Sequence, residues 1–297
     1  MIREKGKEGL YEVFFLAIAS VSMICVLIIC IFLLGQGIAF IGEIGAFEFL
    51  LGTQWNPTNE NNPTFGIFPM MVGSIYITTG AILVGVPIGI LTAIYMTKYC
   101  SKRCYQIIKP MIDLMAGIPS ILYGFFGMTV MVPFIRDTFN GFGIKAFQTT
   151  GLSIFTASLL LGIMILPTII TLSESAIRSV ADEYYHGARA LGATHERAIF
   201  QVILPSAKSG ILAAVVLGIG RAIGETMAVI MVAGNQARLT TNILSGIRTL
   251  TANVVIEMKY ATGQHAEALI ATGAVLFVFI LIINISFSII KRKVVIR

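Results

Sequence analysis

Long apolar stretches without a charged residue set the pattern of this chain. Five of them are uninterrupted, and a sixth contains only Arg221 and Glu225 as charged residues. Each is long enough for the ~20 residues that cross the hydrocarbon core of a bilayer as a helix. The six stretches are Val13–Gly42, Phe65–Thr97, Leu114–Ile135, Ala146–Ser173, Ser209–Ala237 and Ala268–Ile290. The pattern therefore predicts an all-α, polytopic membrane protein with six transmembrane helices.

The composition supports this class and excludes several others. Of the 297 residues, 56% are hydrophobic and 12% are charged, which is about half the ~25% charge of a soluble domain. Disordered, collagen-like and disulfide-stapled secreted chains are excluded. The net charge of +6 is not arranged as a basic stripe with interleaved aromatic residues, so membrane lipid and not nucleic acid is the expected surrounding. The Cys100–Cys104 spacing is a weak metal signal, and no metal or cofactor is expected on this chain.

The distribution of positive charge predicts the orientation. Fifteen of the 21 Lys and Arg residues lie in the two terminal tails and in the loops after the second and fourth spans, and five lie on the opposite face. We expect this chain to lie in the plasma membrane. Because cytoplasmic loops are enriched in Lys and Arg, both termini are expected on the cytoplasmic side. The first apolar stretch is too long for a cleaved signal peptide, and its only A-x-A lies inside it.

Three regions follow along the chain. Residues 1–66 form a cytoplasmic tail, the first transmembrane helix and an external loop, residues 67–290 form a core of five transmembrane helices, and residues 291–297 form a basic tail. Within the core, Pro87 should kink or end its helix, while the glycines on either side of it permit close helix packing. On the external side, apolar residues recur at helical spacing over Arg238–Glu267. We expect an amphipathic helix there, either lying on the membrane, capping a cavity or packed on the ends of the spans.

Two charges interrupt the span Ser209–Ala237, which is the fifth along the chain. Arg221 follows Lys208 by 13 residues, about 20 Å along a helix, and so falls near the middle of the bilayer. A charge there costs at least ~2.5–3.5 kcal/mol and should face the bundle interior or water. Glu225 is one turn away and can pair with it, and Gly220 and Gly224 let another helix approach. The pair is either a staple between helices or an anion site in a pathway, where the guanidinium holds oxyanion oxygens by two parallel hydrogen bonds.

Three hydroxyl groups of the second span are further candidates for that pathway. Ser74, Thr78 and Thr79 could line the same cavity as Arg221, and Ser74 and Thr78 share one helix face. Hydroxyl groups in helices also commonly bond to their own backbone. Both interpretations remain open.

The cytoplasmic loop 174–208 mixes charged and small residues. Asp182–Leu191 predicts a short helix stopped by Gly192, and Thr194 caps a second helix that ends at Leu204-Pro205. Such a compact projection either presses into a cleft on a soluble partner or is an ordinary connector. It resembles the loop signature of ABC-importer permeases, in which Glu-Ala-Ala is followed by Gly and Ile-x-Leu-Pro. The corresponding positions are His186, Gly187, Ala188, Gly192, Val202, Leu204 and Pro205, with His186, Gly187 and Val202 departing from the signature.

This resemblance implies a type I ABC-importer permease fold and a loop that docks on a separate ATP-binding subunit. Three further segments resemble the permease subunits of phosphate importers: RAIGETMAVIMVAGN from Arg221, GIPSILYGFFG from Gly117 and LGTQWNP from Leu51. The resemblance implies ATP-driven import of inorganic phosphate and assigns the substrate pathway to Arg221 and Glu225. It also implies a heterodimer with a second permease, a dimer of ATP-binding subunits that bind the ATP, and an external phosphate-binding protein.

Other functions fit less well. The chain has no G-x-x-x-x-G-K-[ST] motif for ATP and no G-x-S-x-G or H-E-x-x-H motif, so it is not expected to be an enzyme. An autonomous secondary transporter commonly shows internal repeats or several intramembrane charges, whereas one Arg–Glu pair occurs here. A permease for sulfate or molybdate remains an alternative, because an arginine suits all three oxyanions.

Overall fold

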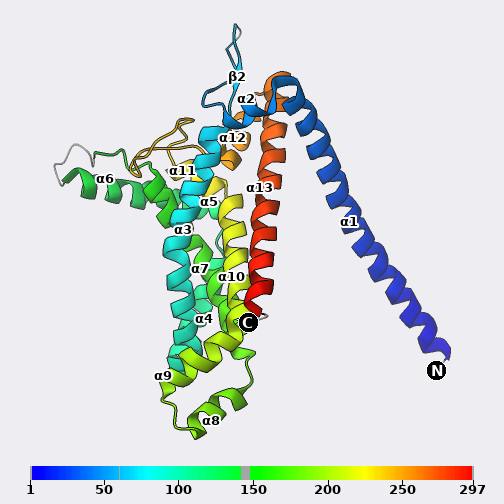
Figure 1. Cartoon of the computed structure of the whole chain (residues 1–297), viewed down its shortest axis with the longest axis vertical. Coiled ribbons are helices and arrows are strands. Elements are labelled where there is room, and N and C mark those ends of the chain that lie inside the picture. The colour runs from blue at the N-terminus through cyan, green and yellow to red at the C-terminus, as the bar shows by residue number, and fades with distance from the viewer. Residues whose placement is uncertain (1, 60, 142–147, 296–297) are drawn as a thin grey trace.

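The computed structural model describes residues 2–59, 61–141 and 148–295. Four long helices form its bundle: α3 (Phe68–Ile94), α7 (Ile154–Arg178), α10 (Leu204–Gly224) and α13 (Gln264–Val295). They run side by side along the long axis of the molecule (Figure 1). Among the described residues, five helices are long and apolar enough to cross a membrane, and a sharply bent helix pair can supply a sixth. The all-α membrane fold is therefore confirmed.

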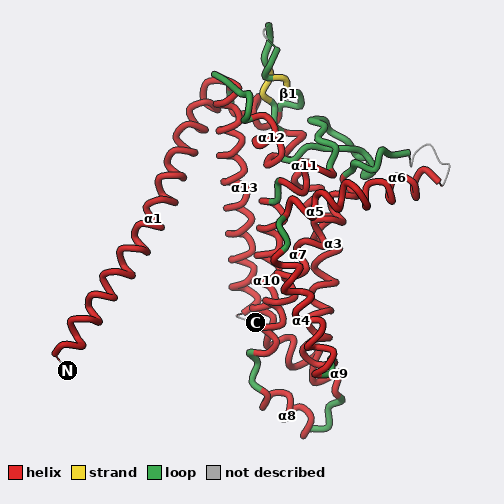
Figure 2. Tube along the Cα trace, turned by 180° about the vertical axis from the view of Figure 1, so that it is seen from behind, coloured by secondary structure: helices red, strands yellow, loops and turns green. Residues whose placement is uncertain are grey.

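Helix α1 (Ile2–Ile44) stands apart from this bundle. It contacts α13 only toward its C-terminal end, where a Cβ atom on Gly37 would lie 2.6 Å from the Cβ of Ala274. From there it diverges, as both ribbon views show (Figures 1 and 2). None of the most apolar window of this helix is buried against the rest of the chain. Because this window is apolar all round, lipid or another membrane subunit must cover it.

The α3–α7 contact forms the centre of the bundle. A Cβ atom on Gly85 would lie 2.8 Å from the carbonyl oxygen of Gly162, and one on Gly89 would lie 2.7 Å from Ile169. The missing side chains let the two backbones approach, as expected for close membrane packing. Pro87 lies between these glycines, yet α3 continues to Ile94, so of the two expected effects of this proline, a kink or a helix end, the helix end does not occur. Buried aliphatic residues such as Leu161 and Ile165 fill the surrounding core.

The third predicted span is not a single helix. The chain forms α4 (Lys102–Gly117), turns by 98°, and continues as α5 (Ser120–Phe126), a π-helical turn and α6 (Val132–Gly141). Ile118 and Pro119 both have extended backbone at the turn, with ψ of 125° and 140°. Pro119 lacks an amide hydrogen and disfavours helical geometry at Ile118, so the helix must end there. The span predicted over Leu114–Ile135 is therefore divided between two helices at this turn.

The expected external helix over Arg238–Glu267 is present only as α12 (Leu250–Glu257). The preceding residues serve another purpose: the carbonyl of Ile243 accepts from the amide of Phe155 at 2.9 Å, and that of Ser245 accepts from Ile154 at 3.1 Å. These amides belong to the first turn of α7, which lacks intrahelical partners. The segment therefore packs on the ends of the spans, with Leu244 and Ile247 buried, and does not lie free as one amphipathic helix.

Short elements complete the same end of the molecule. They are α2 (Ala46–Leu51), β1 (Trp55–Asn56), β2 (Thr64–Phe65) and α11 (Met227–Val232), with β1 and β2 paired antiparallel as a small hairpin. At the opposite end lie α8 (Asp182–Ala190) and α9 (His195–Ala198), together with the N-terminal end of α1 and the C-terminal end of α13 (Figure 1). Lys145 and Arg297, two charges used for the orientation, lie outside the described residues.

Candidate functional site

Arg221 lies in the last turn of α10 with its side chain exposed. Its Nη1 is 3.4 Å from the hydroxyl of Thr168 on α7, and within the described residues it forms no ion pair. A Cβ atom built on Gly220 or Gly224 would meet nothing within 4 Å, so the helix surface beside Arg221 is open. The guanidinium is therefore not sealed among the packed helices of this chain. An anion site requires such access.

Glu225 does not pair with Arg221. Helix α10 ends at Gly224, and Glu225 has extended geometry with ψ of 131°, so the two residues no longer share a helical face. The Oε1 atom of Glu225 instead accepts from the amides of Thr226 at 3.1 Å and Ala228 at 3.2 Å. Those amides open α11 and have no intrahelical partners, and a carboxylate at a helix N-terminus is stabilising. The expected pair is thus replaced by a cap, which leaves Arg221 without a carboxylate partner among the described residues.

The three hydroxyl residues of α3 lie away from Arg221. Ser74, Thr78 and Thr79 line a cavity of about 310 Å³ with residues of α10 and α13, and Arg221 is not part of that lining. The Ser74 hydroxyl donates to the carbonyl of Met70 at 2.9 Å and accepts from the amide of Leu250 at 3.0 Å. Ser74 therefore joins α3 to the start of α12, and the structure does not bring these hydroxyl groups together with the guanidinium.

The loop 174–208 contains the ends of two long helices and a projection between them. Helix α8 forms as expected, Gly192 follows with a φ of +87°, and the Thr194 hydroxyl accepts from the amide of Arg197 at 3.3 Å. That positive φ favours glycine. The second helix does not end at Leu204-Pro205: α9 continues through a π-helical turn into α10, with Pro205 in its first turn. A proline fits there because it has no amide hydrogen to donate, and the π-helical turn before it already interrupts the regular hydrogen-bond pattern of the helix.

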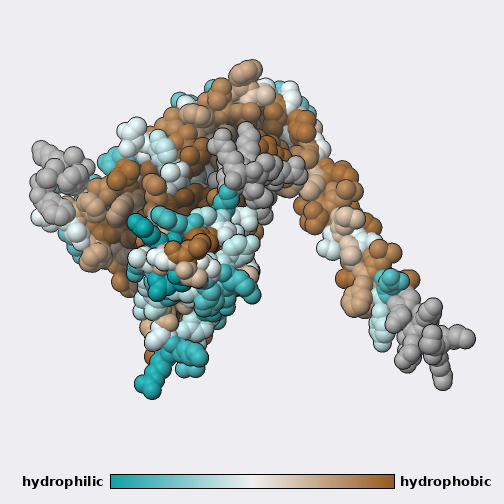
Figure 3. Space-filling view, turned by 60° about the horizontal axis from the view of Figure 1, so that its bottom comes forward, coloured by the Kyte–Doolittle hydropathy of each residue, from teal (hydrophilic) through white to brown (hydrophobic). Residues whose placement is uncertain are grey.

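The projection presents an exposed surface. His186, Gly187 and Gly192 are exposed, Ala188 and Leu204 are half-buried, and Pro205 is exposed. Leu191 is 91% exposed and Tyr184 is 59% exposed, on a segment otherwise rich in charge. Hydrophilic residues gather at this end of the molecule, and apolar residues cover the flanks and much of the α1 arm (Figure 3). Exposed large apolar residues on a polar projection are typical of a protein contact.

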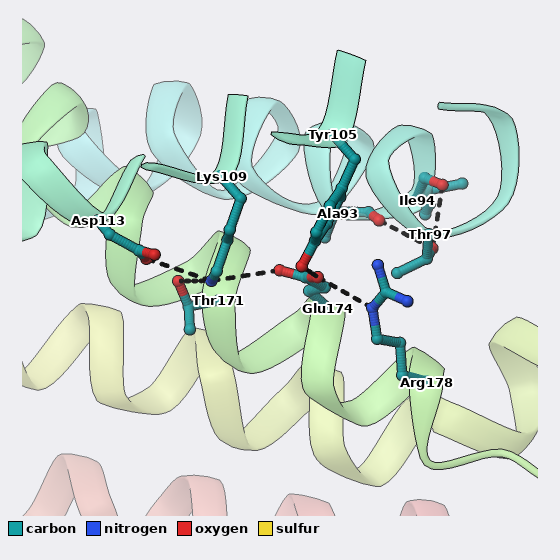
Figure 4. A network of polar contacts seen from close by, with 9 residues as sticks. All are labelled: Ala93, Ile94, Thr97, Tyr105, Lys109, Asp113, Thr171, Glu174 and Arg178. Atoms are coloured by element: carbon teal, nitrogen blue, oxygen red, sulfur yellow. Dashed lines mark hydrogen bonds and ion pairs between the residues drawn. The ribbon is translucent and has the colours of Figure 1, made fainter. Parts of the chain in front are cut away.

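Two polar clusters are not evident from the sequence. At the end that carries α8, Glu174 is 4% exposed and contacts Tyr105, Lys109 and Arg178 (Figure 4). At the opposite end, Glu257 is 7% exposed. Its partners are the indole of Trp55 at 2.8 Å, Arg248 at 2.5 Å and His265 at 2.9 Å. The sequence pattern places Glu174 in a solvated loop and Glu257 in an external helix, because both lie outside the charge-free stretches.

Comparison with known proteins defines the class. Residues 85–296 match the family described as binding-protein-dependent transport system inner membrane component. A probable ABC transporter permease, YqgH of Bacillus subtilis, is 37% identical over 94% of this chain and 89% of its own length. The phosphate transport system permease protein PstC of Mesorhizobium japonicum is 34% identical over 80% of this chain and 76% of its own.

Solved structures agree on the fold. A chain of a bacterial alginate ABC transporter covers 95% of this chain and 95% of its own length, with a TM-score of 0.65 and 17% identity. A chain of the MetNI methionine ABC transporter gives a TM-score of 0.56 at 19% identity, over 77% of this chain and 94% of its own. These chains share the type I ABC-importer permease fold expected from the loop signature.

The fold and the family match together define an integral membrane permease subunit of an ABC importer. The chain belongs to the family of binding-protein-dependent transport system inner membrane components. It is thus a transport subunit and not an enzyme.

Proposed function

We propose that this chain is the permease subunit of an ATP-driven importer of inorganic phosphate, with Arg221 in the substrate pathway. The observation that carries the proposal is the exposed guanidinium of Arg221, outside any ion pair of the described residues, on an open face of a membrane-spanning helix. A charge at such a position is expensive unless water or an anion reaches it. Guanidinium matches tetrahedral oxyanions by parallel hydrogen bonds. Several relatives named as PstC phosphate permeases support phosphate in particular.

The surfaces left uncovered support an assembly. The open face of α10 beside Gly220 and Gly224 suits a second permease, so that Arg221 would line a pathway between two subunits. The α1 arm offers a second apolar surface to the same partner or to lipid. A dimer of ATP-binding subunits would dock on the projection at Leu191 and Tyr184. ATP would bind to those subunits, with no cofactor on this chain.

In the proposed cycle, an external phosphate-binding protein docks on the end that carries the Trp55 hairpin and α12. Closure of the ATP-binding subunits moves the loop 174–208 and opens the pathway outward. Phosphate passes Arg221, and ATP hydrolysis resets the helices inward. Both termini and α8 would face the cytoplasm of a plasma membrane, consistent with their common end of the molecule (Figure 1).

The test is radiolabelled phosphate uptake by the reconstituted complex carrying Arg221→Ala. We expect uptake to fall by about 100-fold, comparable with the loss of one charge-assisted contact to an anion in transit. Arg136→Ala is the matched control, because Arg136 is exposed and paired with its neighbour Asp137 at 2.9 Å. Unimpaired uptake by an assembled Arg221→Ala complex would remove this residue from the pathway. Uptake of labelled sulfate or molybdate, but not phosphate, by the unmodified complex would transfer the proposal to that oxyanion.

A further inference from the structure

We infer that Glu174 is a positioning residue that fastens α4 to α7, so that movement of the loop 174–208 reaches the Arg221 region through α4. The inference rests on the proposed function, because it concerns how that loop acts on the pathway. Glu174 lies in the last turn of α7, four residues before the helix ends at Arg178. It is thus placed directly between the projection and the bundle.

The carboxylate of Glu174 contacts side chains of both α4 and α7 (Figure 4). Its Oε1 accepts from the hydroxyl of Tyr105 on α4 at 2.6 Å and from Nε of Arg178 at 2.9 Å. The Nζ of Lys109 lies 3.4 Å from Oε2 and 3.3 Å from the hydroxyl of Thr171. The Arg178 guanidinium also lies over the Tyr105 ring, 4.8 Å from its centroid. The Glu174 carboxylate, on a residue that is 4% exposed, is therefore contacted by three side chains, two of them from α4.

The polarity of α4 makes this attachment necessary. The helix turns Tyr105 and Lys109 toward α7, while Ile107, Met111 and Leu114 point outward and are 65%, 60% and 72% exposed. In a membrane, apolar side chains give little preference for protein over lipid, so polar contacts have a larger part in helix association. Breaking a buried ion pair by removing one partner leaves an uncompensated charge. Glu174 therefore accounts for most of the polar contacts that fasten α4 to α7.

From α4 a continuous set of contacts leads to Arg221. The hydroxyl of Tyr123 on α5 donates to the carbonyl of Met115 at 2.9 Å, across the sharp turn at Pro119. Gly124 packs so closely on α11 that a Cβ atom there would lie 2.9 Å from the Cα of Ala228. The amide of Ala228 in turn is held by Glu225, directly after α10. Movement of α4 would therefore shift Glu225, the residue that directly follows the helix carrying Arg221.

The test compares three variants in the complex reconstituted in proteoliposomes with its binding protein. Glu174→Gln removes the charge, and Tyr105→Phe removes one hydrogen bond while keeping the ring. Asp113→Asn is the control, because Asp113 is 55% exposed and pairs with Lys109 only within α4. ATP hydrolysis and phosphate uptake are measured on the same sample. We expect Glu174→Gln to keep hydrolysis while uptake per ATP falls about ten-fold, in the range typical of allosteric coupling. Tyr105→Phe should show a smaller loss of the same kind, and Asp113→Asn none.

Uptake per ATP that is unchanged in assembled Glu174→Gln would overturn the inference. So would equal losses of hydrolysis and uptake, which indicate a purely structural staple. If Glu174→Gln does not assemble, Tyr105→Phe decides by the same two criteria.

A second readout separates this inference from the proposed substrate. Spin labels are placed at Met111→Cys on α4 and Ser179→Cys after α7, in a chain whose four native cysteines are replaced by serine. If α4 follows α7, an ATP analogue leaves the label distance unchanged in the complex with intact Glu174 and changes it in Glu174→Gln. A distance that responds alike in both would contradict the inference. If the unmodified complex does not transport phosphate, the proposed substrate fails while this distance still decides the role of Glu174.

Discussion

The indole Nε1 of Trp55 donates a 2.8 Å hydrogen bond to Oε2 of Glu257, joining residues 202 positions apart in the sequence. Glu257 closes α12, and Trp55 begins the small hairpin. His265, at the start of α13, contacts the same carboxylate oxygen at 2.9 Å, and its ring lies 6.3 Å from that of Trp55. One buried carboxylate thus fixes three segments of the end where the binding protein is proposed to dock.

Removing the indole donor tests this attachment. Trp55→Phe keeps an aromatic ring against Phe65 but loses the hydrogen bond to Glu257. Hydrogen bonds to charged groups contribute about 1.5–3 kcal/mol, so we expect a loss of that size in the free energy of unfolding. The measurement is an SDS titration of the purified chain in mixed micelles. A value equal to that of the unmodified chain would show that the hairpin is held by apolar contacts alone.

Removing the carboxylate charge should cost more. Glu257→Gln leaves Arg248, which is 16% exposed, without its ion partner at 2.5 Å. An uncompensated buried charge costs about 3–5 kcal/mol, so this variant should be less stable than Trp55→Phe. The double variant tests whether the two share one network, since coupled contacts give non-additive losses. Strict additivity in the same titration would contradict a common network.

The α3–α7 contact should not tolerate a methyl group. In Gly85→Ala the new Cβ would lie 2.8 Å from a backbone oxygen, which cannot move without displacing α7. Overpacking costs about 1–3 kcal/mol, which exceeds the ~1 kcal/mol that alanine contributes to helix stability. Gly187→Ala is the control, because Gly187 is exposed in α8 and a Cβ atom added there would meet nothing within 4 Å. We expect lower thermal stability in detergent for the first variant and equal or higher stability for the second.

The conformation of the projection depends on Gly192. Its φ of +87° cannot be adopted by proline, whose ring fixes φ near −65°. We therefore expect Gly192→Pro to displace α8 and to uncouple ATP hydrolysis from phosphate uptake in the reconstituted complex. Gly187→Ala serves again as the control in the same loop. Retention of full coupling by Gly192→Pro would show that the geometry of this turn does not transmit the motion.

The sequence predicted the class and most of the helices, because hydropathy is a local property that acts through the membrane. The charge-free stretches around Phe68–Ile94 and Ile154–Arg178 correspond to observed helices, and the motif at Ala188 and Gly192 indicated the family. Helix caps were also predictable: Thr194 caps α9 as its position suggested. Each of these features depends on residues within a few positions of one another.

The partners of the buried charges could not be predicted in the same way. Spacing alone favoured an Arg221–Glu225 pair, but the helix ends between them and Glu225 caps α11 instead. Likewise, helical spacing across 243–258 predicted one helix. Instead, the carbonyl groups of Ile243 and Ser245 accept hydrogen bonds from amides in the first turn of α7. In both cases a distant or newly formed helix end had unpaired amides, and satisfying them outweighed local periodicity.

The sequence by itself therefore determined that the chain crosses a membrane, how most of its spans are placed and which residues carry charge within them. The tertiary structure decided which charged residues are enclosed and which is left open: Glu174 and Glu257 lie among donors that come mostly from other elements, while Arg221 keeps an open surface. The physical reason is that hydropathy acts on each segment separately. Buried polar atoms, by contrast, must find partners that only the packed arrangement brings within hydrogen-bonding distance.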